Sequence, residues 1–368
     1  MENLKEKVGQ LFICKTPDDV NQIGMFIKEG IGGFMIGRGG EIISKSQAVL
    51  EGDSLESLKR FVELLNRLSQ KNKKIPLFLA IDGEGGNYFN RLKSVSDYKS
   101  PRFYGKKFEK DGNIEFFKKE VEKFAELMNQ IGFNMNFAPL VDCAKKGYKG
   151  YVAEERVLIK NKDDLTKSET IAACRSYSDK METVITLGLT AMRIFQEHNI
   201  IPTLKHFPSY GILKKNQNPH RILLKLAILR NKILGQTEPY KKAFKNGCYA
   251  IMKGHIITCL DWNVPTSLSV KIDKFLKDEL NFNGLVVVDE LHMGAIRQYY
   301  RLDLKEVPKR AAVDALKVND IILTSHPEDF IVMRDAIIKE ANKNEKFLNR
   351  INEAYKKVLY YKKIINLL

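Results

Sequence analysis

The sequence lacks any apolar run long enough to cross a membrane. None of its 368 residues belongs to an uninterrupted apolar window of about 18 residues, the length that a transmembrane helix needs. The first residues, 1–7, also lack the apolar stretch of a secretory signal. We therefore expect no membrane partner, and we expect the protein to be cytoplasmic.

Cysteine is scarce, and its spacing shows no pattern. The five cysteines are an odd number and include no Cys-x-x-Cys pair, so neither a disulfide framework nor a cysteine-based zinc site is indicated. The chain has no His-x-His or His-Glu-x-x-His spacing, and we predict no metal. It also has no Gly-x-Gly-x-x-Gly turn of the kind that binds dinucleotides, and we predict no cofactor.

Acidic residues are outnumbered by basic ones. The 61 Lys and Arg against 45 Asp and Glu give a formal net charge of +16, which raises nucleic acid as a partner. The excess is spread along the chain, however, without a basic arm or the aromatic-and-basic signature of an RNA-binding sheet. We interpret it as diffuse surface charge and expect no nucleic-acid partner.

What the sequence has in abundance is an alternation of short apolar runs with amphipathic segments. The runs lack polar alternation, as parallel strands buried on both faces do. Segments 55–68 and 114–128 carry apolar residues at helical spacing, with Ser54 as an N-cap and Gly132 as a helix-ending glycine. The eight runs are Gly9–Cys14, Gly33–Gly37, Pro76–Asp82, Asn134–Asp142, Ile201–Phe207, Tyr249–His255, Leu285–Asp289 and Asp320–Ser325.

Eight strands alternating with helices favour a closed (β/α)8 barrel over an open doubly wound sheet. We predict an α/β protein in which residues 1–368 form a single TIM-type barrel domain. Ionisable residues follow most predicted strands, at the end of the barrel that carries the active site in barrel enzymes. These strand-end residues are Asp82, Asp142, Lys205 with His206, His255, Asp289 and Ser325 with His326.

Several of these segments resemble, in order, the motifs of glycoside hydrolase family 3. Residues 81–86 (Ile-Asp-Gly-Glu-Gly-Gly), followed by Asn90-Arg91-Leu92, are similar to the family's third-strand motif, and residues 136–142 to its fourth strand. Residues 203–208 (Thr-Leu-Lys-His-Phe-Pro) resemble its fifth strand, and residues 280–295 resemble the segment that delivers the nucleophile. The resemblance runs nearly end to end and is greatest for the compact, single-domain bacterial β-N-acetylglucosaminidases.

The resemblance implies a retaining exo-glycosidase that releases terminal β-linked N-acetylglucosamine from cell-wall muropeptides or chitooligosaccharides through a covalent glycosyl-enzyme. The partner would be a small carbohydrate, and the oligomeric state stays open. The nucleophile maps to Asp289. His255, at a strand end, is a candidate rim residue for the substrate or a structural one. The sugar-binding residues implied by the resemblance are Asp82, Arg91, Arg156, Lys205 and His206.

The loop after the fifth strand departs from the family pattern. The compact members carry an Asp-x-His pair there as acid/base, and the corresponding residues are Asn218 and His220. An amide oxygen can accept a hydrogen bond from the imidazole but adds no charge to stabilise its cation. Two alternatives therefore stay open. One is a catalytically impaired barrel that binds an amino sugar, and the other is a phosphorylase or β-glucosidase of the same family, since Lys214 and Lys215 would tolerate a phosphate.

Overall fold

The structure of the protein is a computed structural model. Within the ranges described, no helix has both the length and the apolar character that crossing a membrane requires. For 155–160 and 168–173 the backbone alone is described. The described residues are 3–37, 54–86, 91–92, 94–144, 155–160, 168–173, 175–214 and 217–368.

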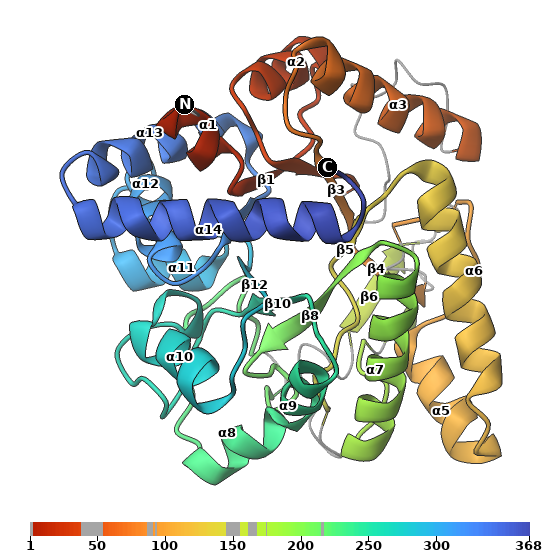
Figure 1. The fold of residues 1–368 in the computed structure, drawn as a ribbon. Helices are drawn as coiled ribbons and strands as arrows, with labels where there is room; N and C mark the ends of the chain where they lie inside the picture. The colour runs from red at the N-terminus through yellow and green to blue at the C-terminus, as the bar shows by residue number, and fades with distance from the viewer. Residues whose placement is uncertain are drawn as a thin grey trace.

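Eight parallel strands close into a barrel at the centre of the molecule (Figure 1). The ring is completed where the first strand meets the last one, with Phe12 paired to Ile322 and Cys14 to Thr324. Each predicted apolar run overlaps one barrel strand, so the predicted (β/α)8 fold is confirmed. Around the ring the strands are β1 (Phe12–Lys15), β13 (Ile321–Thr324), β12 (Leu285–Val288), β10 (Ala250–Lys253), β8 (Ile201–Phe207), β5 (Met135–Asn136), β3 (Phe78–Ile81) and β2 (Gly33–Met35).

Helices form a layer around the barrel and bury its outer face (Figure 1). The predicted caps are confirmed, because Ser54 and Ser57 form a reciprocal capping box and Gly132 adopts the left-handed conformation. The helices are α1 (Leu4–Gly9), α2 (Val20–Lys28), α3 (Leu55–Lys71), α5 (Pro101–Asp111), α6 (Glu115–Ile131), α7 (Met181–Glu197), α8 (Arg230–Gln236), α9 (Glu238–Lys245), α10 (Val270–Lys274), α11 (Gly294–Tyr300), α12 (Val307–Leu316), α13 (Phe330–Ala341) and α14 (Glu345–Ile364).

Short elements complete the structure around the barrel. The strand β4 (Gly83–Gly85) follows β3, and β9 (Leu224–Lys225) pairs with β11 (Ile256–Ile257). The strands β6 (Glu155–Lys160) and β7 (Ser168–Ala173) form an antiparallel pair. The remaining short helical turns are Thr266–Leu268, Phe275–Glu279 and Pro327–Asp329.

The start of the first strand differs from the prediction. Gly9 ends α1 rather than beginning a strand, because Asn3 caps that helix by accepting the N–H of Lys5. A Cβ on Gly9 would lie 2.5 Å from the carbonyl oxygen of Gly30, so this glycine serves the close packing of helix and chain. Gly9 is therefore needed where the end of α1 packs closely against the backbone of Gly30, and the strand β1 begins only at Phe12.

The end of the barrel where the strands begin is closed by α14, which lies across the barrel in Figure 1. The buried Nζ of Lys362 donates to Gln10 Oε1 at 2.8 Å and to the carbonyl oxygens of Gly32 and Pro76 at 3.2 and 2.6 Å. These acceptors are neutral, and burial lowers the pKa of Lys362 to about 7. These acceptors precede β1, β2 and β3. We therefore look for the active site at the carboxyl ends of the strands, where barrel enzymes carry it.

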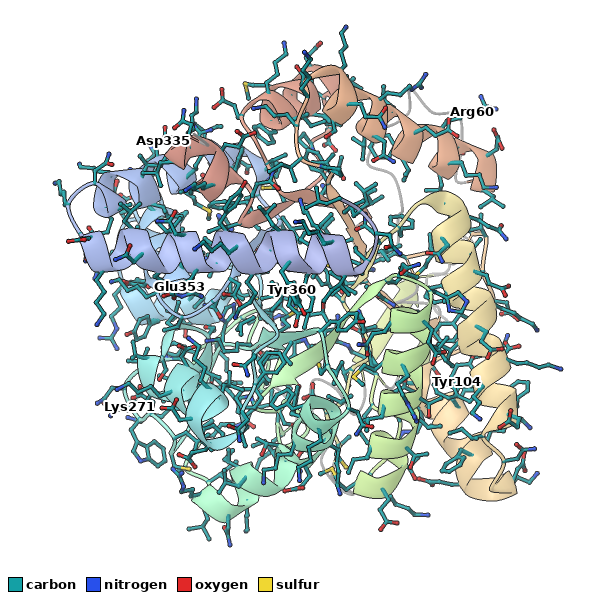
Figure 2. All side chains as sticks on the ribbon, viewed as in Figure 1. Arg60, Tyr104, Lys271, Asp335, Glu353 and Tyr360 are labelled. Carbon is teal, nitrogen blue, oxygen red and sulfur yellow. The ribbon has the colours of Figure 1, made fainter. Side chains whose placement is uncertain are left out.

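A second, smaller apolar cluster supports the loop after β8. It buries Tyr210, Ile212 and Leu213 of that loop against Leu224 and Ile256 of the small two-stranded sheet. Figure 2 shows two basic side chains, Arg60 of α3 and Lys271 of α10, that extend outward from helices away from this loop. The loop after β8 thus has its own packed foundation, which positions the residues described next.

Candidate active site

Charged side chains from two parts of the barrel meet at the carboxyl end of the strands. The ammonium of Lys205, on β8, lies 2.8 Å from Asp82 Oδ1 and 2.7 Å from Glu84 Oε1. Glu84 also accepts two hydrogen bonds from the guanidinium of Arg175, at 2.8 and 2.6 Å. Arg91 approaches Asp82 to 4.0 Å. Each carboxylate is therefore held by two cations.

Burial and charge together fix the protonation of this cluster. Burial would raise the pKa of Asp82, but Lys205 and Arg91 outweigh it and lower that pKa. Burial would likewise raise the pKa of Glu84, but Arg175 and Lys205 hold it well below its usual range. Burial would lower the pKa of Lys205, but Asp82 and Glu84 raise it. All these groups are thus ionised at neutral pH. The side chain of Asp82 is 24% exposed, whereas that of Glu84 is fully buried.

His206, the next residue on β8, is oriented by a buried carboxylate. Its Nδ1 lies 2.9 Å from Asp142 Oδ2, and Asp142 also accepts the backbone N–H groups of His206 and Tyr210. The ring of Tyr210 stacks on the imidazole at 4.4 Å. A carboxylate beside Nδ1 keeps the proton on that nitrogen, so Asp142 sets both the tautomer and the direction of the ring.

The two adjacent acids after β12 have different surroundings, as successive strand residues do. Glu290 Oε1 accepts hydrogen bonds from Nδ1 of His292 at 2.9 Å and from the backbone N–H of Ser325 at 3.2 Å. Burial would raise the pKa of Glu290, but the hydrogen bond and charge of His292 lower it to about 2. Asp289 accepts the backbone N–H of Glu290 at 2.8 Å. Glu290 is thus engaged between β12 and β13, which leaves Asp289 as the acid of the mouth.

His255 lies beneath the mouth rather than at its rim. It is fully buried, with Nδ1 2.7 Å from Ser267 Oγ and Nε2 2.9 Å from the carbonyl oxygen of Glu290. Its backbone N–H donates to the hydroxyl of Tyr210 at 2.8 Å. Of the two roles considered for His255, the structural one fits this geometry, because it braces the chain directly after Asp289.

His220 lies on the loop after β8, and the charges that act on it come from the mouth. Partial desolvation by the surrounding protein lowers the pKa of this exposed imidazole, and the carboxylate of Asp289 is the strongest opposing influence. Asn218 has a backbone role, since its Oδ1 accepts the N–H of His220 at 2.9 Å and closes a local turn. The charge of Asp289 thus favours the protonated form of His220, against the effect of desolvation.

Comparison with protein families gives a match over nearly the whole chain. Residues 3–156 and 164–360 match the model described as the glycosyl hydrolase family 3 N terminal domain. The chain belongs to glycosyl hydrolase family 3. This agrees with the strand-end motifs, which occupy the mouth of the barrel.

Two curated family members are similar in sequence. Beta-hexosaminidase A of Pseudoalteromonas piscicida is 26% identical over 284 residues, which is 71% of this chain and 44% of that protein. A beta-hexosaminidase of Stenotrophomonas maltophilia is 22% identical over 69% of this chain and 68% of its own length. The chain thus spans less than half of the Pseudoalteromonas relative.

Two solved structures share the fold. A glycoside hydrolase family 3 beta-N-acetylglucosaminidase from Paenibacillus has a TM-score of 0.81 and 24% identity, covering this whole chain and 63% of that one. A beta-N-acetylhexosaminidase from Beutenbergia cavernae has a TM-score of 0.78 and 19% identity, and 99% of each chain is covered. These likenesses support the barrel as the architecture of the family.

The structure also shows which site residues the sequence analysis missed. The backbone of Arg156 lies in β6, whose side chains are not described, whereas the guanidinium of Arg175 reaches the buried cluster. Glu84 stands two residues after Asp82 in the same motif and could have been selected for that reason. Asp142 was noted only as a strand-end residue. Arg175 follows β7 and has no such signal in the apolar pattern.

The ion pair of Arg175 and Glu84 predicts a strongly coupled effect on stability. Arg175→Met should lower the free energy of unfolding by about 3–5 kcal/mol, because it removes one of the two cations that compensate the buried carboxylate of Glu84. Adding Glu84→Gln should restore part of that loss. Urea denaturation of the single and double variants measures the coupling. Arg60→Met, which changes an exposed arginine, is the control, and strictly additive effects at 84 and 175 would contradict the prediction.

Proposed function

We propose that this protein is a retaining exo-glycosidase that removes terminal β-linked N-acetylglucosamine through a covalent glycosyl-enzyme. The observation that carries the proposal is the set of polar groups at the carboxyl ends of the strands. Lys205 lies within 2.8 Å of Asp82 and Glu84, and His292 engages Glu290 at 2.9 Å, which leaves Asp289 as the candidate nucleophile. A retaining glycosidase needs one group to attack and another to move a proton. The names of the hexosaminidases among the relatives support the same activity.

In the first step, the carboxylate of Asp289 attacks the anomeric carbon while His220 gives its proton to the leaving oxygen. In the second step, His220 takes a proton from a water molecule, and the resulting hydroxide displaces Asp289 from the sugar. His255 and the backbone of Glu290 hold Asp289 in place. An imidazole suits both steps, because its ordinary pKa of about 6.5 lets it give and take a proton near neutral pH.

The charged cluster is suited to bind the hydroxyls of the sugar that is released. Asp82 is its most exposed carboxylate and can accept two hydroxyl hydrogen bonds, while Lys205 and Arg91 keep it ionised. His206, held by Asp142 through Nδ1, keeps Nε2 for a hydrogen bond with the sugar. Glu84 and Arg175 are buried; Glu84 holds Lys205, and Arg175 in turn holds Glu84. We assign no sugar contact to Arg156.

The leaving group is proposed to be a cell-wall muropeptide, with a chitooligosaccharide as the other substrate. The segment from Pro208 to Thr237 contains six lysines and arginines and no acidic residue, so the side of the mouth that carries His220 favours an anionic leaving group. This would fit peptidoglycan recycling in the cytoplasm by a single-domain enzyme. The described cysteines, Cys14, Cys143, Cys248 and Cys259, are free thiols, which fits a reducing compartment; Cys174 lies outside the described residues.

The relatives favour this activity over the alternatives. The two curated relatives described above are named beta-hexosaminidases, and neither is named a phosphorylase or a β-glucosidase. Lys214 is exposed, and Lys215 lies outside the described residues. The impaired binding barrel depends on Asn218, whose effect is measured below.

Trapping the intermediate tests the nucleophile. A slow fluorinated amino-sugar substrate should leave a covalent adduct on Asp289, located by fragmenting the peptide that also contains Glu290. Aryl β-N-acetylglucosaminide should be hydrolysed faster than aryl β-glucoside, at a rate that inorganic phosphate does not change. An adduct on Glu290, or inversion at the anomeric carbon, would refute the assignment. A phosphorylated sugar product would instead indicate a phosphorylase.

The lowered pKa of His220 predicts the pH dependence of the activity. His220 must be protonated to act as an acid, so kcat/KM should fall as the pH rises through its pKa, which is below the ordinary histidine value of about 6.5. Asn218→Asp places a carboxylate beside the imidazole and favours its cation. The alkaline limb of the pH profile, where kcat/KM falls, should therefore move to higher pH. Turnover of unactivated glycosides should then rise, by up to about 10⁴-fold on the analogy of a serine-protease triad.

The matched control for this variant is Asn231→Asp, which adds the same charge on the exposed surface of α8. It should leave the limb where it is. His220→Ala should remove the limb and slow unactivated substrates more than activated aryl glycosides. If His220→Ala slows neither class, the acid/base lies elsewhere. If wild type and Asn218→Asp bind the amino sugar but cleave nothing, the protein is a binding barrel.

A further inference from the structure

The segment that carries His220 is fastened to the first turn of α11. The backbone N–H of Gly294 donates to the carbonyl oxygen of His220 at 2.8 Å, and that of Ala295 donates to Pro219 at 3.1 Å. The first N–H groups of a helix have no partner within the helix. The loop carbonyls supply those partners, so the backbone of the loop continues the hydrogen bonding of the helix.

Glycine at the start of α11 permits this approach. A Cβ on Gly294 would lie 2.3 Å from the carbonyl oxygen of Arg221 and 2.5 Å from its carbonyl carbon. Any other residue would push the loop away from the helix. The loop residue Pro219 is buried in this contact, which shows that the segment is packed against the barrel and is not merely adjacent to it.

One turn further along α11, the side-chain amide of Gln298 binds the loop through both its nitrogen and its oxygen. Gln298 Nε2 donates to the carbonyl oxygen of Arg221 at 3.1 Å, and Gln298 Oε1 accepts the backbone N–H of Leu223 at 2.9 Å. Residues four apart on a helix lie on the same face, so Gln298 and Gly294 present one surface to the loop. Backbone and side-chain contacts together fix residues 219–223.

We infer that Gln298 is a positioning residue, which holds His220 at a set place relative to Asp289. The helix that fastens His220 begins five residues after Asp289 in the chain, so a short segment connects the supports of the two groups. This inference rests on the proposed function, in which these two residues act on the same glycosidic bond. Such fastening would align the proton donor, His220, with the leaving oxygen of the substrate.

Gln298→Met tests the inference, because methionine keeps the length and helix propensity of glutamine but cannot form either hydrogen bond. Gln298 is exposed, so the variant should fold. Amide hydrogen exchange at residues 217–225 should become faster, and kcat/KM for unactivated glycosides should fall by about tenfold. Activated aryl glycosides, which need little proton donation, should change by less than about twofold. The alkaline limb of kcat/KM should move up toward the ordinary histidine value as the loop releases the imidazole.

Two further variants make the outcome decisive. Gln70→Met, on an exposed helical position of α3, should change neither exchange in the loop nor either substrate. Gly294→Ala should reproduce the selective loss by displacing the carbonyl of Arg221. Unchanged exchange in Gln298→Met would overturn the fastening. Faster exchange with unchanged rates, or an equal loss on both substrate classes, would overturn the positioning role.

The result for the wild-type enzyme separates this inference from the proposed function. If the wild type cleaves neither substrate class, the proposed function fails and the positioning role fails with it, whatever the exchange shows. If the wild type is active and forms the adduct on Asp289, a failure of Gln298→Met to discriminate between substrates refutes the positioning role alone.

Discussion

The buried ammonium of Lys205 is the group on which the rest of the mouth depends. A lysine that is 3% exposed could stay charged only with carboxylates at contact distance, and Asp82 and Glu84 meet that need from one turn of chain after β3. Two carboxylates around one ammonium would leave an excess of negative charge, which Arg175 and Arg91 offset. The cluster therefore adds electrostatic connections between the ends of β3 and β8 and the segment after β7. Removing any one of these side chains would leave an opposite charge of the cluster with less compensation in a buried place.

The opposite side of the mouth is organised by separating two neighbouring acids. His292 lies between Glu290 and Asp329, at 2.9 and 2.7 Å, and burial would lower its pKa, but the two carboxylates raise it. The hydrogen bond from His292 holds Glu290 in the rim and away from the mouth. Among the described residues, Asp289, one residue earlier, has no histidine, lysine or arginine side chain within hydrogen-bonding distance. The difference between two adjacent carboxylates thus arises from one histidine three residues along the chain.

The sequence predicts the barrel well because its signal is local. Each strand is an apolar run between amphipathic segments, and Asp82, Lys205, His206 and Asp289 directly follow or end such runs. Burial at a strand end is not local, so the sequence could not tell that His255 lies beneath the mouth. Arg175 was missed for a related reason: it follows an antiparallel pair that interrupts the strand–helix alternation, and no periodicity marks it. The contact of Gln298 with Leu223, 75 residues apart, depends on the closed ring itself.

The loop after β8 shows how position can replace charge. With Asn218 bonded to the backbone N–H of His220, no acidic side chain of that loop supports the cation of His220, and the strongest charge that favours this cation is Asp289. An imidazole in that situation depends on being held within reach of Asp289. The carbonyl oxygens of Pro219, His220 and Arg221 are all hydrogen-bonded by α11, so the backbone around the imidazole is fixed at three successive residues. The conformational entropy of these residues is lost once, when the protein folds, and does not have to be lost again each time a substrate reacts. The geometry of the proton donor is then a property of the folded barrel, in the same way that the charges around Lys205 are.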